Sequence, residues 1–355
     1  MTYKRWFIQT ALIAGAALAA IAALVIIIDP FFQYHAPLEG FPYQVDNQLS
    51  QNPGMARHMT YDSVLLGSSM TVNFETDWFY EEMGLRTLKL SYNGAYPRDI
   101  SNIMAQVEQS GQPLRHIFLG VDLASYTGGT TETKYPLPDY LYNANPADDV
   151  AYWFNKDVLL DYIIKPMIER EPTDLSSVYS SEESLKGCYS RAYVLANYTI
   201  PEANEAWFPE DMFIEDLEAN LQANILPVIE ACPETQFTIF FPPYSVLYWY
   251  EYIQNNQMDA VMYEYQYFME KLLVYDNVRL FFFPGEERIV CDLDLYADTG
   301  HYNQSINRYM TECFVSGEHR VTQENYREEL QQMRSMIDAY DYEALFAGSS
   351  DREER

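Results

Sequence analysis

The sequence has few basic residues for its length, and this deficit restricts the ligands that the protein can bind. Its 355 residues include 22 lysines and arginines against 52 aspartates and glutamates, a formal net charge of -30. Because phosphates are bound by basic surfaces, this balance argues against nucleic acid and anionic lipid as ligands. Apolar residues are plentiful, at 48% of the chain, so the sequence predicts a folded protein with a sizeable core.

Cysteine is also scarce. Cys188, Cys232, Cys291 and Cys313 stand at wide spacings with no Cys-x-x-Cys pair, which excludes the usual zinc and thioredoxin patterns. An oxidising exterior would permit disulfides, and three pairings of the four residues are conceivable. Four buried thiols that act as small apolar residues fit the sequence equally well.

Several common catalytic motifs are missing. The chain has no Gly-x-Ser-x-Gly, no Walker loop, no His-Glu-x-x-His and no Asp-x-Asp-x-Asp-Gly calcium loop. Their absence disfavours an ordinary α/β-hydrolase, a nucleotide enzyme, a zinc protease and an EF-hand. We expect neither a metal site nor an organic cofactor.

Only one long apolar run occurs, at the N-terminus. Lys4 and Arg5 precede residues 6–28, which carry no charge and match the roughly 20 residues that a helix needs to cross about 30 Å of hydrocarbon. No further lysine or arginine appears before Arg57. The positive-inside rule therefore predicts a cytoplasmic tail, residues 1–5, and a single-pass cell-membrane protein with an extracytoplasmic remainder.

A cleaved signal peptide is the alternative for this run. Its alanines lie mid-segment and are followed by Leu-Val-Ile-Ile-Ile, which is a poor context for cleavage. An uncleaved anchor over residues 6–28 is the interpretation that the sequence favours.

The rest of the chain divides by composition. Residues 29–60 are rich in Pro, Gly, Asn and Gln without sustained periodicity, so they predict a stalk. Residues 61–315 read as a catalytic domain, in which residues 127–208 are too long for one crossover and are expected to be an insertion near the substrate. Residues 316–355 are expected to form a C-terminal helix, which begins near Thr322, and a polar tail.

Short apolar runs separated by helical patterns indicate the fold of the catalytic domain. The expected strands are 63–67, 85–91, 116–123, 236–241 and 277–283, and the expected helices are 98–111, 209–232 and 256–276. This alternation is typical of a doubly wound α/β fold. We expect three layers, α/β/α, with a mainly parallel five-stranded sheet like that of flavodoxin.

A serine follows the first expected strand at a position suited to catalysis. Ligands of α/β sheets bind at the carboxyl ends of the strands, and Gly67 permits a sharp exit there. Ser69 would then open the next helix, where backbone N–H groups and the helix dipole favour developing negative charge. The alternative is that Ser69 merely caps that helix.

A base and an orienting carboxylate are needed to activate such a serine. Asp298 and His301 lie in the loop after the last expected strand, which returns to the same end of the sheet as Ser69. Of the five histidines in the sequence, His301 is the only one that the expected topology brings near Ser69. An ordinary polar loop, with Asp298 starting a turn, is the alternative.

Together these segments resemble the SGNH (GDSL-type) hydrolase superfamily, especially its membrane-anchored bacterial members, from about residue 61 to 315. Residues 64–71, Val-Leu-Leu-Gly-Ser-Ser-Met-Thr, resemble the first block of that family, residues 91–96 its second and residues 298–303 its last. The resemblance implies that Ser69 is the nucleophile, that His301 and Asp298 complete a triad, and that the backbone N–H of Gly94 helps Ser69 to bind the oxyanion.

The third block departs from the family pattern. Asp122 stands where the family usually has an asparagine whose amide is an oxyanion donor. An ionised carboxylate accepts hydrogen bonds and cannot donate them. Either the Asn93 amide is the third donor to the oxyanion, or the oxyanion hole has only the backbone N–H groups of Ser69 and Gly94. Loss of one such donor costs roughly 10²–10³ in rate.

Three residues are candidates for substrate binding. Asp122 follows the third strand, Tyr244 lies in an aromatic segment after the fourth strand and could stack on sugar rings, and Arg57 precedes the first strand and could hold an anionic group. The alternatives are that the aromatic segment packs into the core and that Arg57 forms a surface ion pair.

The resemblance and the residue chemistry predict a serine esterase or O-acyltransferase that acts on acyl groups of a cell-envelope glycan or teichoic-type polymer. The expected partners are that acylated carbohydrate, the membrane through the N-terminal helix, and a membrane acyl-donor protein if the chain is its partner subunit. An inactive glycan-binding or scaffold protein with the same fold is the alternative, because Asp122 departs from the pattern.

Overall fold

The computed structural model of the protein describes residues 3–350, with side chains to residue 347. Residues 1 and 2 of the expected cytoplasmic tail and residues 351–355 of the expected polar tail lie outside this range. The chain forms two compact units. Unit 1 takes residues up to 60, 102–112 and 135–178, and unit 2 takes residues 61–101, 113–134 and 179 onward.

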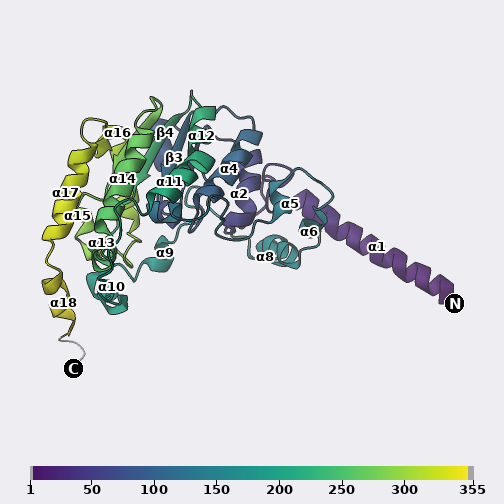
Figure 1. The fold of residues 1–355 in the computed structure, drawn as a ribbon. Coiled ribbons are helices and arrows are strands. Elements are labelled where there is room, and N and C mark those ends of the chain that lie inside the picture. The colour runs from purple at the N-terminus through teal and green to yellow at the C-terminus, as the bar shows by residue number, and fades with distance from the viewer. Residues whose placement is uncertain (1–2, 351–355) are drawn as a thin grey trace. The chain divides into compact units, whose positions relative to one another are not determined.

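Unit 1 is helical. It contains α1 (Tyr3–Ile28), α2 (Gln48–His58), α5 (Asp139–Tyr142), α6 (Val150–Trp153), α7 (Lys156–Leu159), the π-turn η3 (Leu160–Ile164) and α8 (Lys165–Glu169), and α4 (Pro97–Gln109) runs from unit 2 into it (Figure 1). The first helix is long and apolar enough to cross a membrane, as the sequence predicts.

The last turn of α1 belongs to the core of unit 1. Val25 is fully buried and packs with Phe31, Tyr152, Val158 and Ile163. The ring of Phe31 stacks on that of Tyr152 at a centroid distance of 5.5 Å. The apolar helix is therefore continuous with a folded core rather than with a flexible tether.

A buried carboxylate fixes the chain where it leaves α1. Asp29 accepts hydrogen bonds from the backbone N–H groups of Gln33, Tyr34 and His35 and from the Tyr152 hydroxyl, at 2.7 to 3.1 Å. The residue itself has the left-handed φ of 49°, which turns the chain sharply. These bonds satisfy the carboxylate inside the protein, where an unpaired charge would be costly.

The stalk expected over residues 29–60 is corrected by the structure. The segment carries α2, in which Gln51 to Ala56 are buried. The side-chain amide of Gln51 donates to the carbonyls of Pro30 and Gln44. The helix was hidden in the sequence because it contains Pro53 and Gly54 and packs through backbone and polar groups, which leave no apolar periodicity.

Gly54 lies where α2 touches the chain after α1. A Cβ atom at this position would fall 2.0 Å from the Phe31 carbonyl oxygen and 2.6 Å from that of Phe32. Both obstacles are backbone atoms, so a side chain can be accommodated only if the two segments move apart.

We therefore expect Gly54→Ala to destabilise unit 1 by at least about 3 kcal/mol, the upper end of overpacking costs. An ordinary helical Gly→Ala change stabilises by roughly 0.5–1 kcal/mol, so the sign itself is diagnostic. Thermal unfolding of the full chain, followed by circular dichroism, measures the effect. Gly187→Ala is the matched control, because nothing lies within 4 Å of its added Cβ. Equal stability of the two variants would contradict the close approach.

Unit 2 is built on a mixed six-stranded sheet in the order β2-β1-β3-β4-β5-β6. Its strands are β1 (Ser63–Leu66), β2 (Thr87–Lys89), β3 (His116–Gly120), β4 (Gln236–Phe241), β5 (Val278–Phe282) and β6 (Arg320–Val321). The first five strands are parallel and coincide with the predicted ones, whereas β6 pairs antiparallel with β5. The predicted five-stranded sheet is thus wrong by one strand, because two residues are too few to show strand periodicity.

The helical elements of unit 2 surround this sheet. They are η1 (Ser69–Thr71), α3 (Thr76–Met83), η2 (Leu123–Tyr126), α9 (Glu182–Leu185), α10 (Arg191–Asn197), α11 (Ile214–Asn220), η4 (Leu221–Ile225), α12 (Leu226–Ala231), α13 (Val246–Gln254), α14 (Met258–Leu272), α15 (Glu287–Val290), η5 (Leu293–Leu295), α16 (Gln304–Ser316), α17 (Tyr326–Ala339) and α18 (Tyr342–Ser350). The last long helix therefore begins four residues after the expected Thr322 and is interrupted at Tyr340.

Aromatic side chains show that helices cover both faces of the sheet. On one face, Phe240 of β4 packs against Phe314 of α16, with centroids 5.1 Å apart. On the other face, the next residue, Phe241, packs against Phe268 of α14 at 5.4 Å. Successive strand residues point to opposite faces, so both faces are buried, which explains the continuous apolar runs of the sequence.

The expected insertion, residues 127–208, is not one substructure. Residues 135–178 belong to unit 1, and the flanking parts belong to unit 2. Composition cannot detect such a division, because it rests on contacts between segments that are distant in the sequence. All four cysteines lie in the described range and are free thiols, but only Cys313 is buried, so the alternative of four buried thiols holds for Cys313 and not for the partly exposed Cys188, Cys232 and Cys291.

Candidate functional site

Ser69 lies directly beyond the carboxyl end of β1. Gly67 turns the chain out of the strand with a φ of 143°, and a Cβ there would fall 2.6 Å from the Thr71 methyl group. Ser68 is buried, and its hydroxyl accepts from the backbone N–H of Met70 at 3.4 Å. Ser69 is only partly buried, so it is the accessible member of the serine pair.

The expected helix at Ser69 is much shorter than the dipole argument requires. Ser69 opens η1, a 3₁₀ turn of three residues, and the next α-helix starts at Thr76. A macrodipole needs several aligned turns, so it offers little to stabilise negative charge here. Only the individual backbone N–H groups remain for that role.

The loop that precedes α16 and contains His301 lies beside Ser69 and Met70, although it is far from them in the sequence. A hydrogen bond from the Ala297 N–H to the His301 carbonyl, at 2.8 Å, closes the loop. The Tyr302 hydroxyl and the Asn307 amide both donate to the carbonyl of Met70, at 3.3 and 3.2 Å. These two bonds tie the His301 loop and the first turn of α16 to Met70, the residue that follows Ser69.

Ser69, His301 and Asp298 form a continuous hydrogen-bonded relay. The Ser69 Oγ lies 2.8 Å from the His301 Nε2, and the His301 Nδ1 lies 2.7 Å from the Asp298 Oδ2. A carboxylate can only accept, so Nδ1 carries the proton, and Nε2 of the neutral ring accepts from the serine hydroxyl. The predicted spatial meeting of these three residues is thus present in the structure.

The second carboxylate oxygen holds Asp298 in position. Oδ1 accepts from the backbone N–H groups of Gly300 and His301, at 2.8 and 2.7 Å. The side chains of His301 and Asp298 remain 39% and 54% exposed. The relay is therefore accessible from the surface of unit 2.

The ionisation of the relay follows from these contacts. The hydrogen bond to Asp298 raises the pKa of His301 above its usual 6.5, against the opposing effect of burial, and the nearby charges of Asp298 and Asp122 raise it further. Burial by itself would raise the pKa of Asp298, but the bonds and charge of His301 and the two backbone donors outweigh it and lower that pKa. Both shifts favour an ionised carboxylate that supports a protonated imidazole.

The loop after β2 lies beside the exit of β1. The Tyr92 N–H donates to the Gly67 carbonyl at 2.9 Å, and the turn continues through Asn93 and Gly94. Asn93 is exposed. The two candidate oxyanion residues therefore belong to a turn that is hydrogen-bonded to the strand exit two residues before Ser69.

Sequence reasoning missed the cation at this turn. The side chain of Lys134 passes over Gly94, where an added Cβ would meet its Cε at 2.8 Å and its Nζ at 3.2 Å. Two backbone N–H groups, those of Lys134 and Tyr96, donate to the same carboxylate oxygen of Asp99 at 2.9 Å and fix the two segments together. No local pattern announces this lysine, because it comes from a different loop.

Asp122 lies at the carboxyl end of β3, near the relay. Burial raises its pKa, and the Tyr244 hydroxyl and the His301 ring act in the opposite direction. The buried Tyr244 hydroxyl is close to the Asp122 carboxyl without normal hydrogen-bond geometry. Burial first, and then the charge of Asp122, raises the pKa of Tyr244 far above 10, so the phenol stays protonated.

We expect Asp122→Asn to lower the pKa of His301, because the variant removes a negative charge that favours the imidazolium form. The shift should be smaller than that caused by loss of the directly bonded Asp298. Titration of the His301 ring by NMR measures it. An unchanged titration would contradict the expectation, since it would mean that the Asp122 carboxyl is uncharged over the range examined.

The other candidate binding residues have structural partners. Tyr244 is 4% exposed and its ring stacks on Tyr248 at 4.2 Å, so it is not available to stack on a sugar. Arg57 belongs to unit 1, where its guanidinium donates to Gln106, to the Leu141 carbonyl and to Gln33. These contacts agree with core packing for Tyr244. The surface ion pair given as the alternative for Arg57 is wrong, because the partly buried guanidinium donates to uncharged groups.

Comparison with protein-family models, with curated proteins and with solved structures finds no match to this chain.

Proposed function

We propose that the protein is a serine esterase or O-acyltransferase of the SGNH type, with Ser69 as nucleophile. The observation that carries the proposal is the relay from Ser69 through His301 to Asp298, with heavy-atom distances of 2.8 and 2.7 Å. Nucleophile, base and orienting group within hydrogen-bond reach are the geometric signature of an activated serine. A second support is the strand order 2-1-3-4-5 within the parallel part of the sheet, which matches the flavodoxin-like three-layer fold implied by the resemblance.

In the proposed mechanism, the His301 Nε2 takes the Ser69 hydroxyl proton as the oxygen attacks an ester carbonyl. Asp298 keeps the proton on Nδ1 and stabilises the imidazolium. The tetrahedral oxyanion is met by the backbone N–H groups of Ser69 and Gly94, and the Lys134 ammonium adds positive charge at that turn. Collapse breaks the ester C–O bond, and the imidazolium gives its proton to the leaving alcohol.

The acyl group on Ser69 then passes to a second nucleophile. Water gives a free acid and makes the protein an esterase, whereas a sugar hydroxyl makes it an acyltransferase, and His301 removes the proton of either one. We propose an acylated envelope glycan or teichoic-type polymer as substrate. The surface exposure of His301 and Asp298 suits a long chain better than an enclosed small molecule.

We further propose that α1 is an uncleaved membrane anchor with its N-terminus in the cytoplasm. The apolar length of the helix supports the span, and Lys4 and Arg5 at its start support the orientation. Burial of Val25 in the core of unit 1 supports retention of the helix after export.

A fluorophosphonate tests the proposal, because it phosphonylates an activated serine and not a resting hydroxyl. We expect a stable adduct on the full chain in detergent, mapped by peptide mass spectrometry to Ser69. A well-folded chain without an adduct would contradict the enzyme assignment and would favour the inactive glycan-binding alternative. In a separate assay the unlabelled protein is given a short acyl ester and a sugar: release of free acid indicates hydrolysis, and an acylated sugar indicates transfer.

A further inference from the structure

An exposed apolar stripe runs along one face of unit 1. The segments α7, η3 and α8 follow one another without a break from residue 156 to 169, and we call them helix 156–169. Leu160, Ile164, Met167 and Ile168 of this helix are 49%, 40%, 53% and 75% exposed. Their spacing of four, seven and eight residues from the first places them on one side, and we call them the stripe. Large exposed apolar groups gathered in this way mark an interaction surface.

The remainder of helix 156–169 is firmly packed. Val158 and Ile163 are fully buried in the cluster that contains Val25 and Phe31. Asn155 caps the start of the helix and accepts from the N–H of Asp157 at 2.9 Å. The helix thus has one apolar side turned to the core and a second apolar side turned outward, which a helix on a water-exposed surface does not need.

The stripe is located where α1 would leave a membrane. About 20 residues span the hydrocarbon, and counted from Trp6 they end close to Val25. Val25 belongs to the same buried cluster as Val158 and Ile163 of helix 156–169. Helix 156–169 is therefore at the level of the outer interface if α1 is the anchor.

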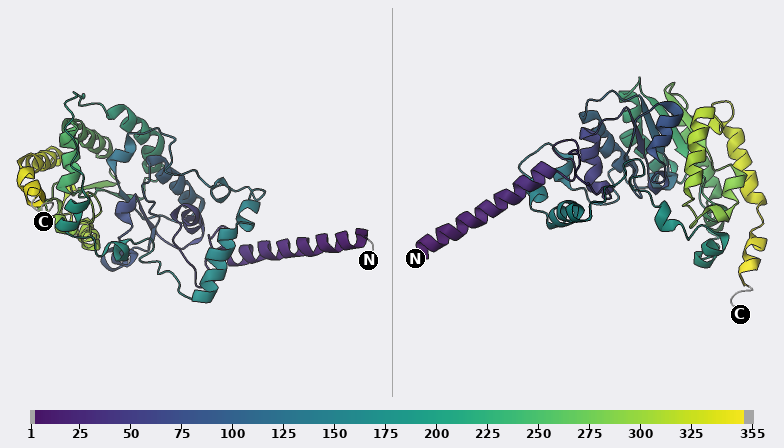
Figure 2. Two further views of the ribbon diagram at one scale, coloured as in Figure 1. Left: turned by 90° about the horizontal axis from the view of Figure 1, so that it is seen from below. Right: turned by 180° about the vertical axis from the view of Figure 1, so that it is seen from behind.

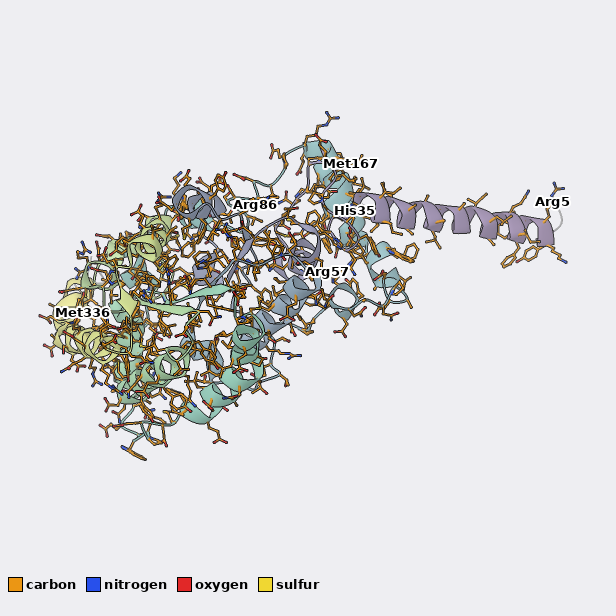
Figure 3. All side chains as sticks on the ribbon, turned by 90° about the horizontal axis from the view of Figure 1, so that it is seen from above. Arg5, His35, Arg57, Arg86, Met167 and Met336 are labelled. Atoms are coloured by element: carbon orange, nitrogen blue, oxygen red, sulfur yellow. The ribbon has the colours of Figure 1, made fainter. Side chains whose placement is uncertain are left out.

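The course of the helix suits that position. Figure 2, left, shows helix 156–169 running across the end of α1 instead of alongside it. Figure 3 shows Met167 and His35 close to one end of α1 and Arg5 at the other. A helix that crosses the end of a spanning helix lies along the membrane surface and not through it.

We propose that helix 156–169 is an interfacial helix whose stripe, Leu160, Ile164, Met167 and Ile168, inserts into the outer surface of the same bilayer that α1 spans. This proposal rests on the proposed role of α1 as a membrane anchor, and it is independent of the proposed catalytic function. Interfacial helices bury their apolar face about 5–10 Å into the boundary between headgroups and acyl chains. Val150 and Phe154, which precede the helix, are also 49% and 43% exposed.

Charge indicates which property of the bilayer is recognised. Residues 156–170 carry three cations, Lys156, Lys165 and Arg170, and three anions, Asp157, Asp161 and Glu169, so their net charge is zero. Attraction to anionic headgroups therefore contributes little, and burial of apolar area is the driving force. The proposal accordingly requires only a zwitterionic bilayer.

The test uses the full chain in nanodiscs of phosphatidylcholine, prepared either with plain or with brominated acyl chains. Bromine quenches tryptophan only on contact within the bilayer. Ile168→Trp places the reporter at the most exposed position of the stripe, and Met167→Trp gives an independent reading from the next position. Val274→Trp in unit 2, 65% exposed in the parent, is the matched control. The signal of the parent chain is subtracted from each.

We expect the added fluorescence of the two stripe variants to be lost in brominated nanodiscs and that of the control to be retained. Retained fluorescence in all three, while Trp6 of the parent is quenched, would overturn the interfacial helix and leave the anchor intact. Stripe fluorescence that is unquenched by bromine but shielded from aqueous acrylamide would also overturn the proposal. That result would mean that a protein, such as a second copy of the chain, covers the stripe.

Discussion

Replacement of Ser69 by alanine is expected to abolish both fluorophosphonate labelling and ester hydrolysis, with a fall in kcat/KM of roughly 10⁴- to 10⁶-fold. The variant should keep the fold, because Ser69 is only partly buried. The lost hydroxyl bonds to the His301 Nε2, which is itself partly exposed. What it removes is the atom that would form the acyl-enzyme in the proposed mechanism. Background hydrolysis assisted by the oxyanion donors sets the remaining rate.

The neighbouring serine provides a matched control. Ser68→Ala removes a buried hydroxyl whose hydrogen bond to the Met70 N–H is long, at 3.4 Å. Loss of such a cap costs about 1 kcal/mol of stability and leaves the relay intact. Ser68→Ala should therefore retain labelling. Labelling that survives Ser69→Ala but disappears in Ser68→Ala would identify Ser68 as the nucleophile. That result would refute the proposed relay through Ser69.

The second large effect is expected for Asp298→Asn, with a fall in kcat/KM of about 10³- to 10⁴-fold. An asparagine amide can donate to Nδ1, which moves the imidazole proton to Nε2. In that tautomer the ring cannot accept the proton of Ser69. Almost no structural change is required, since the amide has the shape of the carboxylate.

The pH dependence gives a second signature of this variant. In the proposed mechanism the neutral imidazole is the active base, so activity should rise with pH through the pKa of His301, which Asp298 raises above 6.5. Asp298→Asn removes the negative charge, so the pKa of His301 falls. The rising limb of the pH–rate profile therefore moves to lower pH, while the maximum rate decreases. Rate profiles of both proteins between pH 5 and 9 measure the shift. Asp294→Asn, an exposed aspartate four residues earlier, is the control and should leave both the rate and the limb unchanged. A limb that stays in place in Asp298→Asn would show that another group titrates.

The parallel strands and the relay could be predicted because local patterns encode them. The strand β4 is buried on both faces, as Phe240 and Phe241 illustrate, so its residues form a nearly uninterrupted apolar run. Parallel strands bring their carboxyl ends to one edge, and this places Ser69 and the His301 loop together although 232 residues separate them. The proximity of Ser69 and His301 therefore follows from the order and direction of the strands and not from a fixed number of residues between the two.

Unit 1 could not be predicted in the same way. It is assembled from three separate stretches of chain, and pairs such as Tyr43 and Thr173 hold them together by hydrogen bonds of 2.9 Å from backbone groups. Long-range backbone and amide contacts leave no periodicity in any one stretch. The same limit applies to Lys134 near Gly94 and to the two-residue strand β6, since each is defined only by a distant neighbour.

The burial of Val25 has a practical consequence for work with this protein. A secreted or recombinant form that begins after Ile28 would lack a side chain that fills the centre of unit 1, and would place a new charged amino group beside the Asp29 carboxylate. Shortening should therefore stop within the apolar helix, one or two turns before Val25, with polar replacements on the turns that remain. The boundary between the membrane-compatible part of the chain and the folded core of unit 1 lies inside the helix itself.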